Sequence, residues 1–174
     1  MEPELSTDAL IALLSDPSLD VRHDAIKKLA GRGGEVTLYL IAALEQAQTS
    51  DARWYLAVTL SKIGQPAIQP LVDAMGRNRD PEFRRYAAAA LGEIGEPAIQ
   101  ALIGALGADD RELRGCASQA LCRIGKPATG ALMECTKSDD ETLRSCATLT
   151  LWQMGEYGLQ PLIEQEKKEA GKGA

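Results

Sequence analysis

The sequence predicts an all-α protein made of stacked helix pairs, and a recurring motif is the first observation that leads to this fold class. The motif is clearest as FRRYAAAALGEIGEPAI in residues 83–99, where an apolar residue and Arg open a helical pattern that ends in Ile-Gly and Pro-Ala. Its final glycine returns after 31, 31, 30 and 30 residues, at Gly33, Gly64, Gly95, Gly125 and Gly155. A period in this range is typical of stacked repeat arrays.

Composition is the second observation. Aromatic residues make up only 4% of the chain, while alanine and leucine supply much of the 45% hydrophobic fraction. This balance suits close-packed helices better than a β-sandwich, because alanine and leucine are strong helix formers and strands favour aromatic and β-branched residues.

The first repeat contains the signals of two helices. Ser6, Thr7 and Asp8 are candidate N-caps for a helix over residues 5–14, where leucine and isoleucine recur at helical spacing. After a turn, a second apolar pattern predicts a helix over residues 19–31, which a cluster of glycines ends. We name the first helix of each repeat the A helix and the second the B helix.

The same A and B pattern returns in four further repeats. The five repeats are predicted at about residues 5–33, 34–64, 65–95, 96–125 and 126–155 of a single repeat domain spanning residues 1–174. A last helix over residues 156–168 is expected to cap the array, because Gln165 and Glu166 stand where the other repeats have apolar residues. Residues 169–174 have no apolar anchor, so we expect this tail to fray.

Glycine and proline are predicted to end each B helix. The glycine after the helix is expected to take the left-handed conformation, and the proline two residues later, at Pro66, Pro97 and Pro127, cannot continue the helix. Pro70 and Pro161 fit in the first turn of their A helices if those helices begin just after the turn, where an amide has no partner within the helix.

Charge and hydropathy exclude several classes of protein. With 25 acidic and 19 basic residues the net charge is −6, which argues against a protein whose main task is to coat nucleic acid. No apolar run approaches the ~20 residues that span a bilayer, and the acidic start MEPELSTDAL lacks the basic region of an export signal. We therefore expect a cytoplasmic monomer without membrane contact.

The stretches VRHDAIKKLA, FRRYAAAALGEIGEPAI and LRGCASQALCRIGKPAT resemble the short HEAT-like repeats first associated with phycobilin lyases. The resemblance covers about residues 5–164 and implies a right-handed α-α superhelix of five helix pairs plus a C-terminal capping helix, with the B helices on the concave side. Two departures fall in the first repeats, where Glu35 replaces the usual proline and Ala52 a larger apolar residue. The resemblance indicates architecture rather than activity, because this scaffold serves unrelated roles.

The resemblance also implies a recurrent arginine that bonds to acidic groups of neighbouring repeats. This position holds Arg22, Arg53, Arg84, Arg114 and Arg144, with candidate partners at Asp20, Asp51, Glu82, Asp110 and Asp140. A column of guanidinium groups could instead form a track for an anionic ligand. On a helical wheel the arginine borders the core face, so we expect its head group to act inside the protein as a structural ladder.

Residues that support catalysis do not occur in a working pattern. His23 is the one histidine, and no glycine-rich phosphate loop or nucleophile motif occurs outside the helix ends. The four cysteines lack CxxC spacing and are expected to be reduced, with Cys122 and Cys135 as small packing residues. Cys116 and Cys146 are expected to be exposed thiols, either plain surface residues or sites of bilin attachment or redox sensing. We predict no enzyme, no cofactor and no metal site.

The free positions of each B helix form one exposed stripe, opposite the core on the same wheel. In the first repeat the stripe includes His23, Asp24 and Lys27. The residues predicted to bind a partner on the concave face are Trp54, Tyr55, Val58, Lys62, Arg85, Tyr86, Cys116, Gln119 and Arg123.

An aromatic and mildly basic stripe favours an acidic or mixed peptide or protein surface over duplex nucleic acid. We therefore expect a non-enzymatic protein-interaction scaffold whose partner is a peptide or protein. Two alternatives stay open. In the first, Trp54 and Tyr55 only cover the neighbouring helix and bind no partner. In the second, the chain is a bilin-lyase-like accessory protein that handles a tetrapyrrole, and mixing it with bilin would give a visible absorption band.

Overall fold

The computed structural model describes residues 5–170 and contains no β-strand within that range. It forms two compact units, one ending at Ile94 and the other beginning at Gly95. The helices of the first unit, with 3₁₀ helices marked η, are α1 (Thr7–Leu13), α2 (Leu19–Gly31), η1 (Gly33–Val36), α3 (Thr37–Gln46), α4 (Ser50–Ile63), α5 (Gln65–Arg77) and α6 (Pro81–Ile94). Those of the second unit are η2 (Glu96–Ala98), α7 (Ile99–Leu106), α8 (Arg111–Ile124), η3 (Lys126–Ala128), α9 (Thr129–Cys135), α10 (Glu141–Gln153) and α11 (Glu156–Ala170).

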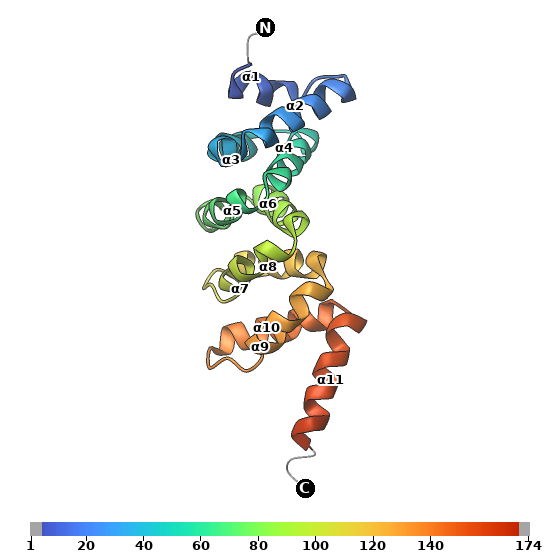
Figure 1. Ribbon diagram of the computed structural model, residues 1–174. Coiled ribbons are helices and arrows are strands. Elements are labelled where there is room, and N and C mark those ends of the chain that lie inside the picture. The colour runs from blue at the N-terminus through green and yellow to red at the C-terminus, as the bar shows by residue number, and fades with distance from the viewer. Residues whose placement is uncertain (1–4, 171–174) are drawn as a thin grey trace. The chain divides into compact units, whose positions relative to one another are not determined.

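The first unit consists of three helix pairs arranged in two layers. α1 packs on α2, α3 on α4 and α5 on α6. The A helices α1, α3 and α5 form one layer, and the B helices α2, α4 and α6 form the other (Figure 1). Side chains with no exposed surface fill the space between the layers, among them Leu29, Leu40, Leu60, Leu71 and Phe83. Burial of each such side chain contributes about 1.5–3 kcal/mol, so the interlayer core stabilises the unit.

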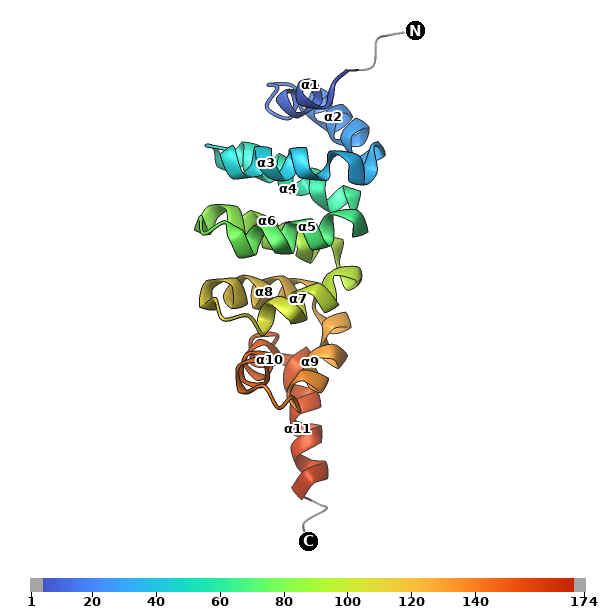
Figure 2. The ribbon, with the colours of Figure 1, turned by 90° about the vertical axis from the view of Figure 1, so that its left-hand side faces the viewer.

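The second unit consists of two helix pairs and a covering helix. α7 packs on α8 and α9 on α10, while α11 contacts both α9 and α10 (Figure 2). Gly158 allows this contact, because a Cβ atom there would lie 2.0 Å from the carbonyl oxygen of Leu151.

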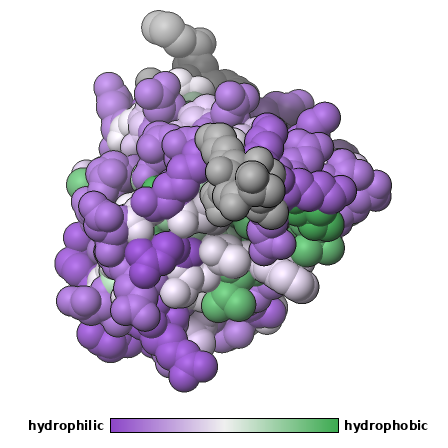
Figure 3. Space-filling view, turned by 90° about the horizontal axis from the view of Figure 1, so that it is seen from below, coloured by the Kyte–Doolittle hydropathy of each residue, from purple (hydrophilic) through white to green (hydrophobic). Residues whose placement is uncertain are grey.

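In the view of Figure 3 hydrophilic side chains cover most of the surface, and hydrophobic side chains show only in small groups.

At several helices the side chain of the N-cap residue accepts hydrogen bonds from amides of the first turn. The Ser6 hydroxyl accepts a hydrogen bond of 3.2 Å from the Ala9 amide, so one of the predicted N-caps of the first helix is confirmed. Asp110 and Asp140 each accept hydrogen bonds from two amides in the first turns of α8 and α10. The sequence indicated these aspartates only as arginine partners, and the structure adds their role as N-caps, which contributes about 1 kcal/mol each.

Three of the five glycines that follow the B helices have positive φ, but not the predicted left-handed helical conformation. Gly64, Gly95 and Gly125 have φ of 76°, 83° and 74° and ψ of −135°, −140° and −137°. These values lie close to the extended positive-φ region that glycine alone populates. This geometry turns the chain directly into the following helical segment.

Pro70 and Pro161 lie deeper in their helices than predicted. α5 begins at Gln65, directly after Gly64, and α11 begins at Glu156, directly after Gly155. Each proline is therefore inside its helix rather than in the first turn, and the prediction for these two residues is wrong. The physical reason is the abrupt glycine turn, which leaves no loop before either helix.

The predicted all-α fold of five helix pairs followed by a further helix is confirmed. The last helix, α11, reaches Ala170 rather than residue 168, and residues 171–174 of the predicted frayed tail lie outside the described residues. The repeat boundaries and the single-domain organisation stay predictions. Over residues 5–170, every helix is too short or too polar to cross a lipid bilayer.

We expect Gly64→Ala to lower the free energy of unfolding by about 1–3 kcal/mol, because an L side chain at this φ and ψ is strained. Packing does not contribute, since nothing lies within 4 Å of the added Cβ. Gly76→Ala is the matched control: it lies in α5, also meets nothing within 4 Å, and should stabilise the protein by about 0.4–1 kcal/mol. Urea unfolding curves measure both changes, and a Gly64→Ala variant as stable as wild type would contradict this account.

Candidate functional site

A groove lies between α2 and α4 in the first unit. It encloses about 590 Å³ and is lined by His23, Ile26, Lys27, Ala30, Trp54, Tyr55, Val58 and Lys62. The lining side chains come from both helices, because α2 and α4 pack side by side. Ile26 is buried, Ala30, Tyr55 and Val58 are half-buried, and the other four are exposed. The groove therefore combines an apolar base with exposed basic and aromatic side chains.

Tyr55 is held in place from two directions. The guanidinium carbon of Arg22 lies 4.7 Å from the centroid of the Tyr55 ring, and the Trp54 ring centroid lies 5.8 Å from it with an interplanar angle of 54°. Arg22 is itself fixed by a 3.0 Å ion pair with Asp51 and a hydrogen bond to the Asp16 carbonyl. The Tyr55 ring is thus positioned by contacts within the protein.

Trp54 and Tyr55 differ in how far they cover the neighbouring helix. Tyr55 is half-buried against Arg22 of α2, as expected of a side chain that packs on the adjacent repeat. Trp54 leaves 51% of its surface exposed. Packing against the neighbouring helix partly explains why a tyrosine is present at position 55. It does not explain why the Trp54 indole is half exposed to solvent.

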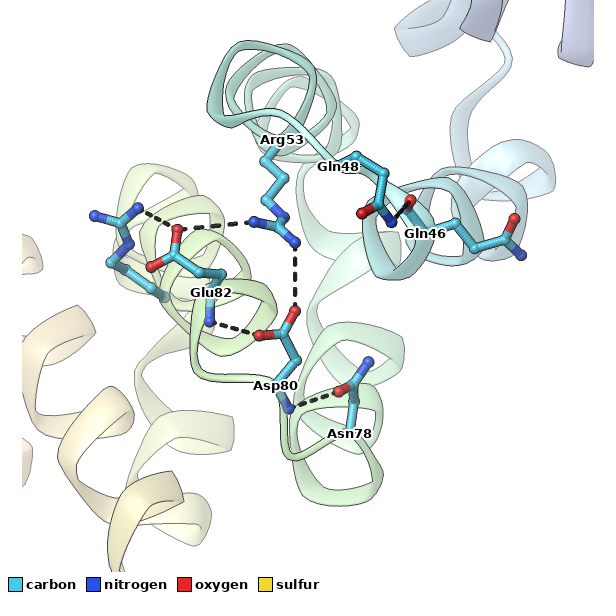
Figure 4. A network of polar contacts seen from close by, with 7 residues as sticks. Gln46, Gln48, Arg53, Asn78, Asp80 and Glu82 are labelled. Atoms are coloured by element: carbon cyan, nitrogen blue, oxygen red, sulfur yellow. Dashed lines mark hydrogen bonds and ion pairs between the residues drawn. The ribbon is translucent and has the colours of Figure 1, made fainter.

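A second aromatic side chain, Tyr86, lies on α6 within a network of charges. The guanidinium carbon of Arg85 lies 4.8 Å from the Tyr86 ring centroid, and Arg85 Nη2 lies 2.7 Å from Glu82 Oε2. Arg53 of α4 reaches Glu82 at 3.8 Å and Asp80 at 3.5 Å (Figure 4). Asp80 also accepts a 3.1 Å hydrogen bond from the Glu82 amide, so the network ties α4 to the beginning of α6.

The structure places all nine predicted partner-binding residues on B helices, and none of them is buried. Those on α4 and α6 share the first unit: Trp54, Tyr55, Val58, Lys62, Arg85 and Tyr86. Cys116, Gln119 and Arg123 lie on α8 of the second unit. The candidate site described here is therefore a surface of the first unit alone.

Part of the groove lining was not predicted from the sequence. Ile26 and Ala30 lie outside the exposed stripe of the helical wheel, so the pattern gave no reason to select them. His23 and Lys27 were placed on the exposed stripe but not among the binding residues. The repeat period could have identified His23 and Lys27. Lys27 and Val58 are 31 residues apart, one repeat period, so they occupy the same position of the exposed stripe in adjacent repeats.

The arginine column makes its contacts inside the protein. Arg84 Nε donates a 2.7 Å hydrogen bond to the Asn78 carbonyl, and Arg84 is only 1% exposed. Equivalent hydrogen bonds join Arg114 Nη1 to Ala108 at 2.8 Å, Arg144 Nη1 to Ser138 at 2.6 Å, and Arg22 Nε to Asp16. Each carbonyl lies six residues earlier, just after the A helix of the same pair. These contacts support the ladder role, which stays a proposal until stability is measured.

The four cysteines are all free and half-buried. The prediction that Cys116 and Cys146 are exposed is therefore wrong: they lie on α8 and α10, which pack side by side, and the protein covers part of each residue. Burial raises the pKa of the Cys122 thiol, and a hydrogen bond with Ser118 lowers it by less. Burial, followed by the charge of Glu134, also raises the pKa of Cys135. Over residues 5–170, no group of three or more histidine, cysteine or acidic residues is placed to hold a metal ion.

Comparison with known proteins gives one family. A family model described as HEAT repeats matches residues 7–81 and 68–152. The chain is similar to a solved complex of CpcE and CpcF of phycocyanin lyase from Nostoc sp. PCC7120, with 22% identity, 83% of this chain and 96% of that chain covered, and a TM-score of 0.42. It is also similar to a designed armadillo repeat protein, with 18% identity, coverage of 86% and 82%, and a TM-score of 0.34.

At these TM-scores neither structural likeness says anything about the function of this chain. A search of curated proteins found no match.

We expect Arg84→Ala to lower the free energy of unfolding by about 1.5–3 kcal/mol, since it removes a buried charged donor from a carbonyl. Arg114→Ala should have a smaller effect in the same direction, because Arg114 is only half-buried. The exposed Arg111, at the beginning of the same helix, is the control, and its alanine variant should stay within about 0.5 kcal/mol of wild type. Thermal unfolding measures all three, and unchanged stability for Arg84→Ala and Arg114→Ala would overturn the ladder.

We expect Cys122 and Cys135 to alkylate slowly in the folded protein. Their raised pKa values lower the fraction of reactive thiolate at a mildly alkaline pH, and burial restricts access. Iodoacetamide labelling followed by peptide mass spectrometry gives the rate at each residue, and the same protein in urea provides the reference rate. Equal rates for folded and unfolded protein at these two residues would contradict this prediction.

Proposed function

We propose that this chain, which belongs to the HEAT repeat family, binds a protein or peptide partner through the B-helix surface of its first unit. The observation that carries the proposal is the pair formed by Trp54, which is 51% exposed, and Tyr55, which Arg22 holds at the edge of the groove. The proposal assigns binding rather than catalysis to the chain, acting as a monomer in the cytoplasm.

The residue types at this surface support binding of a protein. Tryptophan, tyrosine and arginine carry most of the binding energy in protein interfaces, because they combine a large apolar area with hydrogen-bonding or charged groups. Trp54, Tyr55, Arg85 and Tyr86 supply these types on the adjacent helices α4 and α6. The internal contacts of Tyr55 and Tyr86 lower the ordering cost of binding, since both rings are already positioned.

The charge of the surface favours a protein over nucleic acid. Three arginines of the first unit, Arg22, Arg53 and Arg84, bond to carbonyl or carboxylate groups within the protein. Their charges are therefore not available as a continuous track for phosphates, which nucleic-acid binding requires. The exposed cations that remain near the groove, Lys27 and Lys62, are too few for such a track.

The test is to capture partners from the native cell extract with the wild-type chain and with Trp54→Ala and Tyr86→Ala variants. Each variant should weaken binding of the captured partner by about 2 kcal/mol, or about 30-fold, if the side chain is a central contact. Mass spectrometry identifies the partner, and titration with the purified partner measures the affinity.

The matched controls lie in the second unit. Trp152 and Tyr157 are each 63% exposed, so Trp152→Ala and Tyr157→Ala remove the same side chains from a different surface. The proposal expects these two variants to bind like wild type. If all four variants keep their fold and bind with unchanged affinity, the surface of the first unit is not the binding site.

A further inference from the structure

The groove between α2 and α4 has a one-sided charge. Its lining includes His23, Lys27 and Lys62 but no carboxylate, although the whole chain has a net charge of −6. Other surface depressions do contain carboxylates, from Asp8 and Glu35 in one and from Glu156 and Glu164 in another. An acidic protein with a carboxylate-free basic groove offers a local match for a negatively charged ligand.

The nearby acidic groups are already paired away from the groove. Asp24 Oδ2 lies 2.7 Å from Lys28 Nζ, and Asp51 Oδ2 lies 3.0 Å from Arg22 Nη1. In contrast, no ion pair among the described residues includes Lys27 or Lys62, and both are exposed. These two lysines are therefore available for an external carboxylate.

The apolar and basic side chains are separated along the groove. Trp54 and Tyr55 lie near the beginning of α4, whereas Lys62 lies in its last turn. Tyr55 and Lys62 are seven residues apart, which is about 10 Å at the rise of an α-helix. About three residues of an extended chain span this distance.

We propose that this groove takes an acidic peptide segment of a partner protein, in which a bulky apolar residue and an Asp or Glu lie two to four residues apart. The apolar side chain contacts Trp54, Tyr55 and Val58, and the carboxylate lies near Lys62 or Lys27. The inference rests on the proposed function, because it names the chemistry of the partner at the same surface. The charge argument is independent of Trp54 and can fail separately.

The experiment selects ligands from a random peptide library displayed on phage, with the full chain immobilised. Enriched peptides are expected to share the apolar residue and the carboxylate at the stated spacing. One enriched peptide is then synthesised and titrated by fluorescence anisotropy against wild type and a Lys27→Glu, Lys62→Glu double variant. The double variant should bind about tenfold more weakly or worse, and added salt should weaken wild-type binding.

A matched control keeps the net charge equal. Lys126→Glu with Lys137→Glu changes the chain by the same number of charges, and both lysines are exposed residues of the second unit. This control should bind the peptide like wild type. A peptide with Lys in place of its Asp or Glu should lose binding to wild type and regain it with the Lys27→Glu, Lys62→Glu variant.

Several results would overturn the inference. These are enrichment of basic or uncharged peptides, no enrichment at all, or equal binding by the groove variant and its control. Sedimentation that shows self-association, lost on Lys27→Glu with Lys62→Glu, would assign the groove to a second copy instead. If peptide binding does not depend on the two lysines but native partners are still captured in a Trp54-dependent way, the inference fails while the proposed function stands. If neither the peptide binding nor the Trp54-dependent capture is seen, this surface is not a binding site.

Discussion

The hydrogen bond from a B-helix arginine to a carbonyl just after the A helix recurs through this architecture, and it is the interaction that we propose holds each helix pair together. In four helix pairs the donor is Arg22, Arg84, Arg114 or Arg144, and the acceptor lies six residues earlier. The accepting carbonyls, those of Asp16, Asn78, Ala108 and Ser138, lie in the short connection that follows each A helix. A backbone carbonyl outside regular secondary structure needs a hydrogen-bond donor when it is shielded from water. One guanidinium therefore satisfies this carbonyl and ties the connection to the B helix.

The same arrangement decides which charges remain at the surface. Because the arginines serve the interior, the exposed charge of the α2–α4 groove comes from lysines, whose flexible side chains can follow a ligand rather than hold the fold. Arg53 shows the variation within the column, since it reaches Asp80 and Glu82 of the next pair at 3.5 and 3.8 Å. Contacts of this kind are between neighbouring repeats, as expected of a repeat protein whose stability is a sum of nearest-neighbour terms.

The sequence predicts most of the fold because the repeat period, the apolar spacing and the glycine positions all point to the same helix pairs. The exposed stripe was also predictable, since a helical wheel assigns faces correctly when the core side is as regular as it is here. Pro70 and Pro161 were misplaced because each helix begins directly after its glycine, at Gln65 and Glu156, and the residue pattern does not report where a helix begins. Ile26 and Ala30 were missed as groove residues because a depression between two helices depends on the space left by side chains from both, such as Tyr55 and Val58.

Arg22 takes part both in the contacts between helices and in the candidate binding site. Its guanidinium bonds to the Asp16 carbonyl within its own helix pair, pairs with Asp51 of the next, and lies against the Tyr55 ring. A ring fixed by a structural contact loses little further freedom when a ligand covers it, so the proposed binding surface gains rigidity from contacts within the fold. Trp54 has no comparable clamp and keeps half of its surface in water. The proposed site thus pairs a rigid aromatic base with an exposed indole, which suits a bound apolar side chain, and the proposal assigns selection by charge to the lysines along the groove.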